Sequence, residues 1–214
     1  MKLPAIAYLL VVVCVGYERP YFGIEQDATR TFDCHTAFRA GDDFVALQKR
    51  FGESEVMELE IDLGEGFREK GAVVFPNSAE DRVEVRWRDP AIGQGLKSVH
   101  VKGKNSKWRT STGLAVGDHL QTVERLNRKP FRLSGFGWDH GGTTLSWEGG
   151  RLESSASAPC AVRVRLQPDD ATDYAGLYYR QVSGDRQFSS GHPAMQSVNP
   201  TVSDIWLVFK VGLK

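Results

Sequence analysis

The sequence predicts an α+β protein: a mainly antiparallel sheet with two short helices packed on one face, built from two similar helix-then-strands units. Residues 41–47 and 117–123 both begin with Gly-Asp and continue with apolar residues at helical spacing, so the motif occurs twice. Each copy precedes several segments in which apolar and polar residues alternate, a pattern typical of strands with one wet face. The links between these segments are short, which favours antiparallel neighbours.

The first unit is predicted over 17–110. Asp42 or Asp43 caps a helix whose apolar face is Phe44, Leu47 and Phe51, and a glycine follows the last apolar turn. Before the helix the chain is irregular, with one short strand around 31–34. After the helix, strands are predicted at 56–63, 72–75, 83–87 and 99–101, with Trp108 on a returning strand. The strand at 56–63 is expected to be half-buried.

The second unit is predicted over 111–214, with a C-terminal extension, packed with the first unit as one globular body. Asp118 opens its helix, and Gln121 completes a capping box. Leu120, Val123 and Leu126 form the apolar stripe, which Pro130 terminates. Strands are then expected at 131–133, 143–147, 162–166 and 204–209.

Composition and charge restrict the class of partner. Of the 214 residues 41% are hydrophobic, which is enough to bury a core in one domain or in two closely packed small ones. The counts of Lys+Arg and Asp+Glu are both 27, so the basic excess that nucleic-acid binding requires is absent.

The first residues indicate export. Lys2 is followed by an uncharged, mostly apolar run over 3–16, which is typical of a signal peptide cleaved after Gly16. The run is shorter than the roughly 20 residues of a membrane-spanning helix, so no stable span is expected after its removal. A buried N-terminal strand is the alternative. A lipoprotein with acylated Cys14 is disfavoured by the bulky Val13. The protein is therefore expected to be periplasmic or secreted.

Cleavage would leave two cysteines, Cys34 and Cys160, which suits a disulfide in an oxidising compartment. The loop it closes is long, and the chain-entropy model gives such a bridge roughly 4–5 kcal/mol. The alternative is a reactive Cys34 beside His35. This alternative is disfavoured because neighbouring residues on a strand point to opposite faces.

The segment 136–142 contains the densest group of chemically active side chains. Trp138, Asp139 and His140 lie between glycines and are suited to ligand stacking or acid–base work. A tight hairpin with an inward Trp138 explains the same residues structurally and is the favoured interpretation. His192, two residues after Ser190, offers a serine–histidine pair, but no nucleophile-elbow pattern surrounds it.

Other polar patterns favour ordinary surface roles. The stripe Glu58, Glu60 and Asp62 spaces its carboxylates too widely for one calcium ion and suits a solvated face. Basic residues around Trp108 form a local patch, which is either an anion site or protection of an edge strand. The sequence has no zinc-ligand spacing, P-loop or dinucleotide fingerprint, so no metal and no cofactor are expected.

Several segments resemble a group of uncharacterised exported bacterial proteins. The segments are 31–35, 47–52, 74–76, 86–89, 126–131 and 135–139. This resemblance covers most of the chain after the signal and implies no catalytic residues. The order of helix and strands is also similar to the β-lactamase-inhibitor-protein-like fold, which implies a sheet surface that binds a protein. The extension over 167–214 departs from that fold.

Two functions are therefore expected. The first is a non-enzymatic binding module of the bacterial envelope that holds a protein or envelope component on the wet sheet face. The second is a hydrolase-like enzyme that combines Trp138, Asp139 and His140 with His192 or Cys34. A pocket that gathers these segments would favour the enzyme, and an open sheet with an intact Cys34–Cys160 bridge would favour the binding module.

Overall fold

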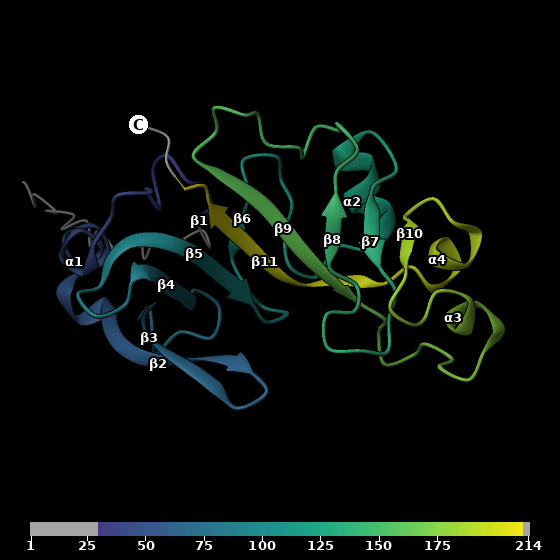
Figure 1. Ribbon diagram of the computed structural model, residues 1–214, viewed down its shortest axis with the longest axis horizontal. Coiled ribbons are helices and arrows are strands. Elements are labelled where there is room, and N and C mark those ends of the chain that lie inside the picture. The colour runs from purple at the N-terminus through teal and green to yellow at the C-terminus, as the bar shows by residue number, and fades with distance from the viewer. Residues whose placement is uncertain (1–29, 212–214) are drawn as a thin grey trace, which may run out of the picture.

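The segments of alternating apolar and polar residues form one six-stranded antiparallel sheet, which dominates the fold (Figure 1). The computed structural model of the protein describes residues 30–211. The strands of this sheet are β2 (Val56–Gly64), β3 (Phe67–Val74), β4 (Val83–Asp89), β5 (Gln94–Lys102), β9 (Cys160–Gln167) and β11 (Thr201–Phe209). Their spatial order is β2-β3-β4-β5-β11-β9, so β4 and β5 lie at the centre and β11 lies between β5 and the edge strand β9. The predicted α+β class with a mainly antiparallel sheet is confirmed.

Two smaller sheets accompany it. Strands β7 (Arg132–Ser134), β8 (Thr144–Ser146) and β10 (Gln187–Ser189) are ordered β10-β7-β8. A bridge between Thr143 and Arg165 connects this sheet to β9. Strands β1 (Arg30–Thr31) and β6 (Trp108–Arg109) pair in parallel. The prediction that Trp108 returns beside the strand at 99–101 is wrong, because β6 turns into the core and pairs with β1.

The described chain has four short α-helices: α1 (Phe44–Phe51), α2 (Leu120–Asn127), α3 (Leu177–Gln181) and α4 (Pro193–Val198), with a 3₁₀ helix, η1 (Glu53–Glu55), after α1. Helix α1 begins and ends as predicted, since Asp43 accepts a hydrogen bond from Ala46 N and Gly52 follows its last residue. Helices α3 and α4 lie in the extension, where no helix was predicted. Each is too short to show a helical repeat of apolar residues, although Pro193 at the start of α4 is a helix-start signal.

Helix α2 does not begin with the predicted capping box. Its N-cap residue is His119, without a side-chain cap, and the Asp118 carboxylate instead accepts a hydrogen bond from Ala115 N. The cap comes from a distant part of the chain: Gln121 N donates to Asn199 Oδ1 at 3.3 Å. Such a cap cannot be predicted from the residues that neighbour the helix in the sequence.

The two Gly-Asp segments make the same backbone contacts, one with the start of β5 and the other with the start of β11. In each, the helix start and the strand start exchange two hydrogen bonds. They are Phe44 N to Gly93 O and Gly95 N to Asp42 O in the first segment, and Leu120 N to Pro200 O and Val202 N to Asp118 O in the second. The likeness ends there. The strands after α1 are consecutive neighbours, whereas after α2 the chain divides between two sheets. A repeat of whole units stays a prediction.

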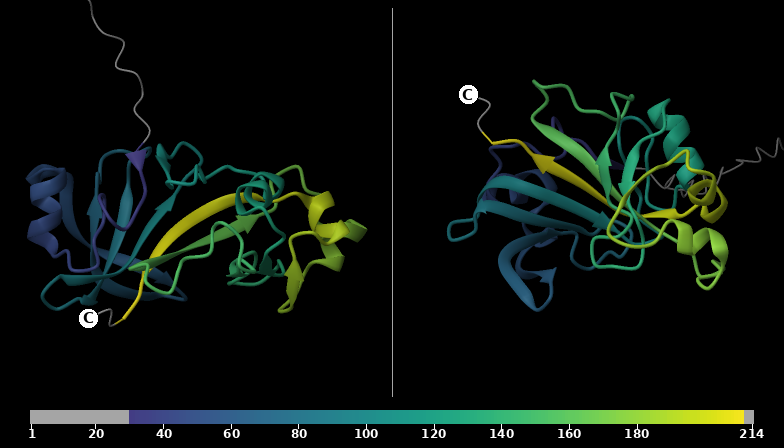
Figure 2. Two further views of the ribbon diagram at one scale, coloured as in Figure 1. Left: turned by 90° about the horizontal axis from the view of Figure 1, so that it is seen from above. Right: turned by 45° about the vertical axis from the view of Figure 1, so that its right-hand side comes forward.

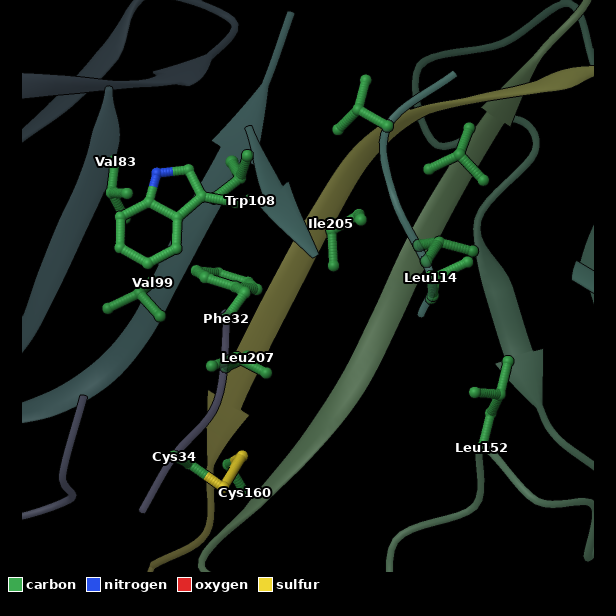
Figure 3. Close-up of a cluster of buried hydrophobic side chains, with 14 of the residues drawn as sticks. Phe32, Cys34, Val83, Val99, Trp108, Leu114, Leu152, Cys160, Ile205 and Leu207 are labelled. Atoms are coloured by element: carbon green, nitrogen blue, oxygen red, sulfur yellow. A yellow bond between two sulfur atoms is a disulfide. The ribbon is translucent and has the colours of Figure 1, made fainter. Parts of the chain in front are cut away.

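The apolar faces of the strands and helices meet in one continuous core. Figure 3 shows its centre, where Phe32 and Trp108 pack on residues of the sheet with ring centroids 5.9 Å apart. The disulfide between Cys34 and Cys160 lies at its margin, with a Cα–Cα distance of 6.2 Å. The predicted disulfide is therefore present, and it joins the segment before α1 to β9.

The predictions about the first residues of the sequence concern a part of the chain that the structure does not describe. The signal over 1–16, its cleavage after Gly16 and the acylation of Cys14 lie outside the described residues. Among the residues that the structure describes, no helix is both long and apolar enough to cross a bilayer.

Candidate functional site

The polar face of the six-stranded sheet carries an open groove of about 1080 Å³. Its floor is formed by β5, β11 and β9. One wall is the turn of the β2–β3 hairpin, with Leu63 and Phe67, and the other is the loop between β7 and β8. Both the hairpin and the loop extend along the same side of the sheet (Figure 1).

The centre of the floor is a row of side chains across neighbouring strands. In register, Arg163 of β9 faces Trp206 of β11, and Trp206 faces His100 of β5. The rings of Trp206 and His100 are stacked, with centroids 4.4 Å apart and an interplanar angle of 11°. The row continues with Glu84 on β4, opposite His100. Side chains from four strands are therefore placed side by side by register alone.

His100 is held between two carboxylates. Its Nε2 lies 2.7 Å from Asp204 Oδ1, and its Nδ1 lies 3.3 Å from Glu84 Oε2. Burial alone would lower the pKa of His100, but the hydrogen bonds and charges of Asp204 and Glu84 outweigh it and raise that pKa above 6.5. The imidazole therefore joins three adjacent strands, and both carboxylates favour its cationic form.

The pKa values of the two carboxylates shift in the opposite direction. Burial alone would raise the pKa of Glu84, but hydrogen bonds with His100 and Lys102 lower it to about 2. The pKa of Asp204 is also lowered: burial is opposed by hydrogen bonds with His100 and Ser203. The surroundings of both carboxylates therefore favour their anionic forms, and His100, Glu84 and Asp204 form a polar network of which His100 and Asp204 line the groove.

Two basic side chains enter the groove beside this network. At a bulge in β5, Arg86 pairs with Ser98 and Trp87 pairs with Leu96, which leaves Lys97 as the extra residue. Bulges re-aim side chains, and Lys97 lines the groove, 3.9 Å from Glu69. Arg163 is exposed and also lines the groove. Within the described chain its guanidinium has no hydrogen-bond or ion-pair partner.

The structure brings three predicted site residues, Trp138, Asp139 and His140, into the wall of this groove. The ring of Trp138 meets the His140 ring edge-on, with centroids 5.5 Å apart, and its Nε1 donates to Gly135 O at 2.9 Å. A hydrogen bond attaches the loop to β9, because Arg165 Nη2 donates to Asp139 O at 2.7 Å. The loop is thus a fixed wall and its side chains face the floor residues.

The other predicted site residues lie elsewhere. His192 is the N-cap of α4, where its Nδ1 accepts a hydrogen bond from Ala194 N, and it does not line the groove. Trp108 is buried, and its Nε1 donates to Asp81 O at 2.7 Å, so it does not present a face to a ligand. The lysines that surround it in sequence form separate ion pairs with Glu69, Glu84, Asp170 and Glu80.

The geometry limits the acid–base chemistry that the described residues can perform. Both ring nitrogens of His100 are engaged by carboxylates, so neither is free to accept a proton from a nucleophile. Cys34 is in the disulfide and has no thiolate to offer. Over residues 30–211 no histidine ring is hydrogen-bonded to a Ser, Thr or Cys side chain, and no group of three or more His, Cys, Asp or Glu side chains is arranged to hold a metal ion.

Sequence reasoning did not identify His100, Asp204, Trp206 or Arg163 as site residues. The available signal was that Glu84 and His100 fall on the polar faces of predicted strands, but residues far apart in the chain become neighbours only when the register is known. Comparison of the chain with protein-family models, curated proteins and solved structures found no match in any of the three.

Proposed function

We propose that this protein is a non-enzymatic binding module of the bacterial envelope, and that it holds a protein or envelope component in the groove on the polar face of its sheet. The observation that carries the proposal is Arg163. An exposed guanidinium without a partner in the described chain stands beside the half-exposed ring of Trp206, on the floor of an open groove.

The chemistry of the groove indicates which part of a ligand it receives. Arg163 and Lys97 offer charge to an anionic group, and guanidinium binds carboxylates and phosphates in a bidentate manner. Trp206 and Trp138 offer flat apolar surface next to these charges, and aromatic and Arg side chains are enriched in protein-binding surfaces. A ligand that combines an acidic group with an apolar or aromatic part therefore fits best.

The compartment in this proposal rests on the first residues and on the disulfide. The basic, then apolar sequence over 1–16 is typical of an export signal, and a disulfide between Cys34 and Cys160 is the kind of bond that persists in an oxidising compartment. The enzyme alternative has less support, because the groove gathers Trp138, Asp139 and His140 but neither His192 nor Cys34.

The experiment is affinity capture from envelope extracts with the wild type and three variants of the protein. Arg163→Glu reverses the charge on the floor, and Trp206→Ala removes the aromatic surface. Arg151→Glu is the matched control, since Arg151 is exposed and does not line the groove. We expect one component to bind the wild type and the control and to be lost with both groove variants, while the free energy of unfolding of the Arg163→Glu variant stays within about 0.5 kcal/mol of the wild type.

Capture that is equal with Arg163→Glu and with the wild type would contradict the proposal. So would a hydrolytic activity of the purified protein that disappears in a folded Asp139→Ala/His140→Ala variant, because that result would establish the enzyme instead.

A further inference from the structure

Strand β2 is an edge strand in which most residues are exposed. It is the first strand in the order of the six-stranded sheet, it has 9 residues, and within the described chain only β3 pairs with it. Its outer edge thus leaves a row of backbone N–H and C=O groups unpaired by any described strand, which is a template for another strand.

The apolar face of β2 is exposed as well. Met57, Leu59 and Leu63 are 47%, 37% and 40% exposed, and only Ile61 on that face is buried. The length of the hairpin accounts for the exposure of Leu59 and Leu63, whereas Met57 lies opposite Val73, within the part of β3 that pairs with β4. Strand β2 pairs with β3 from Val56 to Gly64, whereas β3 pairs with β4 only over Ala72–Val74. The outer part of the hairpin therefore extends beyond the sheet, as the lower margin of the right-hand view shows (Figure 2).

The opposite face of β2 is acidic. Glu58, Glu60 and Asp62 alternate with the apolar residues and are all exposed. Lys70 of β3 lies 2.9 Å from Glu58, and Asp62 accepts a hydrogen bond from Gly64 N. The carboxylate of Glu60 has no partner in the described chain. An acidic stripe with only one ion-pair partner, Lys70, thus follows the free edge.

This charge pattern indicates which kind of strand could pair with the free edge of β2. Two copies of β2 paired in antiparallel orientation would bring their acidic stripes together, and like charges opposite each other destabilise a pair of strands. A second copy is therefore disfavoured. A strand whose apolar residues alternate with lysine or arginine would cover Met57, Leu59 and Leu63 with one face and neutralise Glu58, Glu60 and Asp62 with the other.

We propose that the free edge of β2 binds an extended, basic segment of a partner protein by strand addition. Backbone hydrogen bonds supply the affinity in this mode, and alternate side chains supply the specificity. Leu63 also lines the groove, but Arg163 and Trp206 lie on β9 and β11, at the other end of the strand order from β2. The inference therefore does not rest on a ligand bound at Arg163 and Trp206.

The probe is a synthetic nine-residue peptide of alternating lysine and valine, labelled with a fluorophore and titrated with the full-length protein. Fluorescence anisotropy is expected to rise and saturate. Two control peptides test the mode of binding: one with glutamate in place of lysine, and one with the same composition but its lysines grouped at one end. We expect both to bind at least about tenfold more weakly, because neither matches the charge and the alternation of β2.

Variants of the protein locate the site. Glu58→Gln/Glu60→Gln neutralises two charges on the edge, and we expect roughly fivefold to tenfold weaker binding of the lysine–valine peptide. Glu53→Gln/Asp185→Asn changes the net charge by the same amount at two exposed positions outside β2, and we expect unchanged binding. Arg163→Glu is also expected to leave this binding unchanged, which separates the edge from the groove.

Hydrogen exchange gives a second, direct readout. The outward amides of β2 are expected to exchange fast in the free protein and slowly with the peptide bound. Equal binding of the grouped-lysine peptide, or an equal loss of affinity in both double variants, would overturn the proposal. Slow exchange of these amides in the free protein would also overturn it, because another part of the chain or a second copy would then occupy the edge.

Discussion

His100 shows how a single residue can join three strands. The stabilisation that it supplies requires the imidazolium, whose pKa is raised above 6.5 because Asp204 and Glu84 outweigh its burial. A group with a raised pKa in the folded state stabilises the fold fully below its unfolded pKa and loses this effect as the pH rises through the folded pKa. The two carboxylates act in the opposite direction: their stabilisation is present above their unfolded pKa values, and that of Glu84 is lost as the pH falls toward about 2.

The first prediction is that His100→Gln lowers the free energy of unfolding by about 3 kcal/mol near pH 5.5, because two partly buried carboxylates lose their cation. The difference from the wild type is expected to shrink above the raised pKa of His100. Urea unfolding at several pH values measures it, with His35→Gln, at an exposed position, as the control. A difference that does not change between about pH 5.5 and pH 9 would show that the charge of His100 is irrelevant.

For single residues, the sequence predicted which side chains lie on the polar faces of strands but not which of them are in contact. The alternation around Val83 and Val99 placed Glu84 and His100 on wet faces. The contact of His100 with Asp204 depends on the register between β5 and β11, and these two residues are 104 positions apart in the sequence. Trp108 was misplaced for a related reason. The lysines near it indicated a surface patch, whereas its indole lies in the core.

Among the elements, the loop between β7 and β8 depends on one glycine. Gly142 has a φ of +75°, and a Cβ built there would lie 1.9 Å from Leu166 O. This close approach lets Leu166 N donate to Gly142 O at 2.9 Å and fixes the groove wall to β9. The loop that presents Trp138 and His140 therefore has a position that only glycine allows.

The second prediction compares two glycines with similar backbone angles. Gly142→Ala is expected to lower the free energy of unfolding by about 3 kcal/mol or more, because left-handed strain and a backbone clash add together. Gly149→Ala is the control. Its φ is +67°, and the nearest atom to a new Cβ is Lys129 Nζ at 3.8 Å, so only the strain of about 1 kcal/mol applies. Thermal unfolding measures both, and equal losses would contradict this account.

Most strands could be predicted from sequence because alternation is a local property, and α1 was predicted because Asp43 and Gly52 are local signals. The expectation that β2 is half-buried was wrong for a non-local reason. Its alternation is regular, but burial requires a covering layer, and β4 pairs only with the inner part of β3. The start of α2 was wrong because its cap, Asn199, lies on another element.

For the whole molecule, the Cys34–Cys160 bridge joins residues 126 positions apart. The third prediction is that reduction lowers the free energy of unfolding by roughly 4–5 kcal/mol, because the unfolded chain regains the freedom that the closed loop removes. Urea unfolding with and without reductant measures the change. The Cys34→Ala/Cys160→Ala variant is the control and should not respond to reductant. A wild type that is equally indifferent to reductant would show that the bridge does not form in solution.

The position of β11 between β5 and β9 has a consequence for how the sheet assembles. Among the described strands β11 is synthesised last, yet it is the neighbour of both β5 and β9 in the sheet. A nascent chain that has not reached residue 201 can form the four strands β2 to β5 but leaves the edge of β5 open and β9 without its partner. Pairings between such distant segments form slowly, so the exposed edge of β5 on the unfinished polypeptide is the surface that a chaperone would protect.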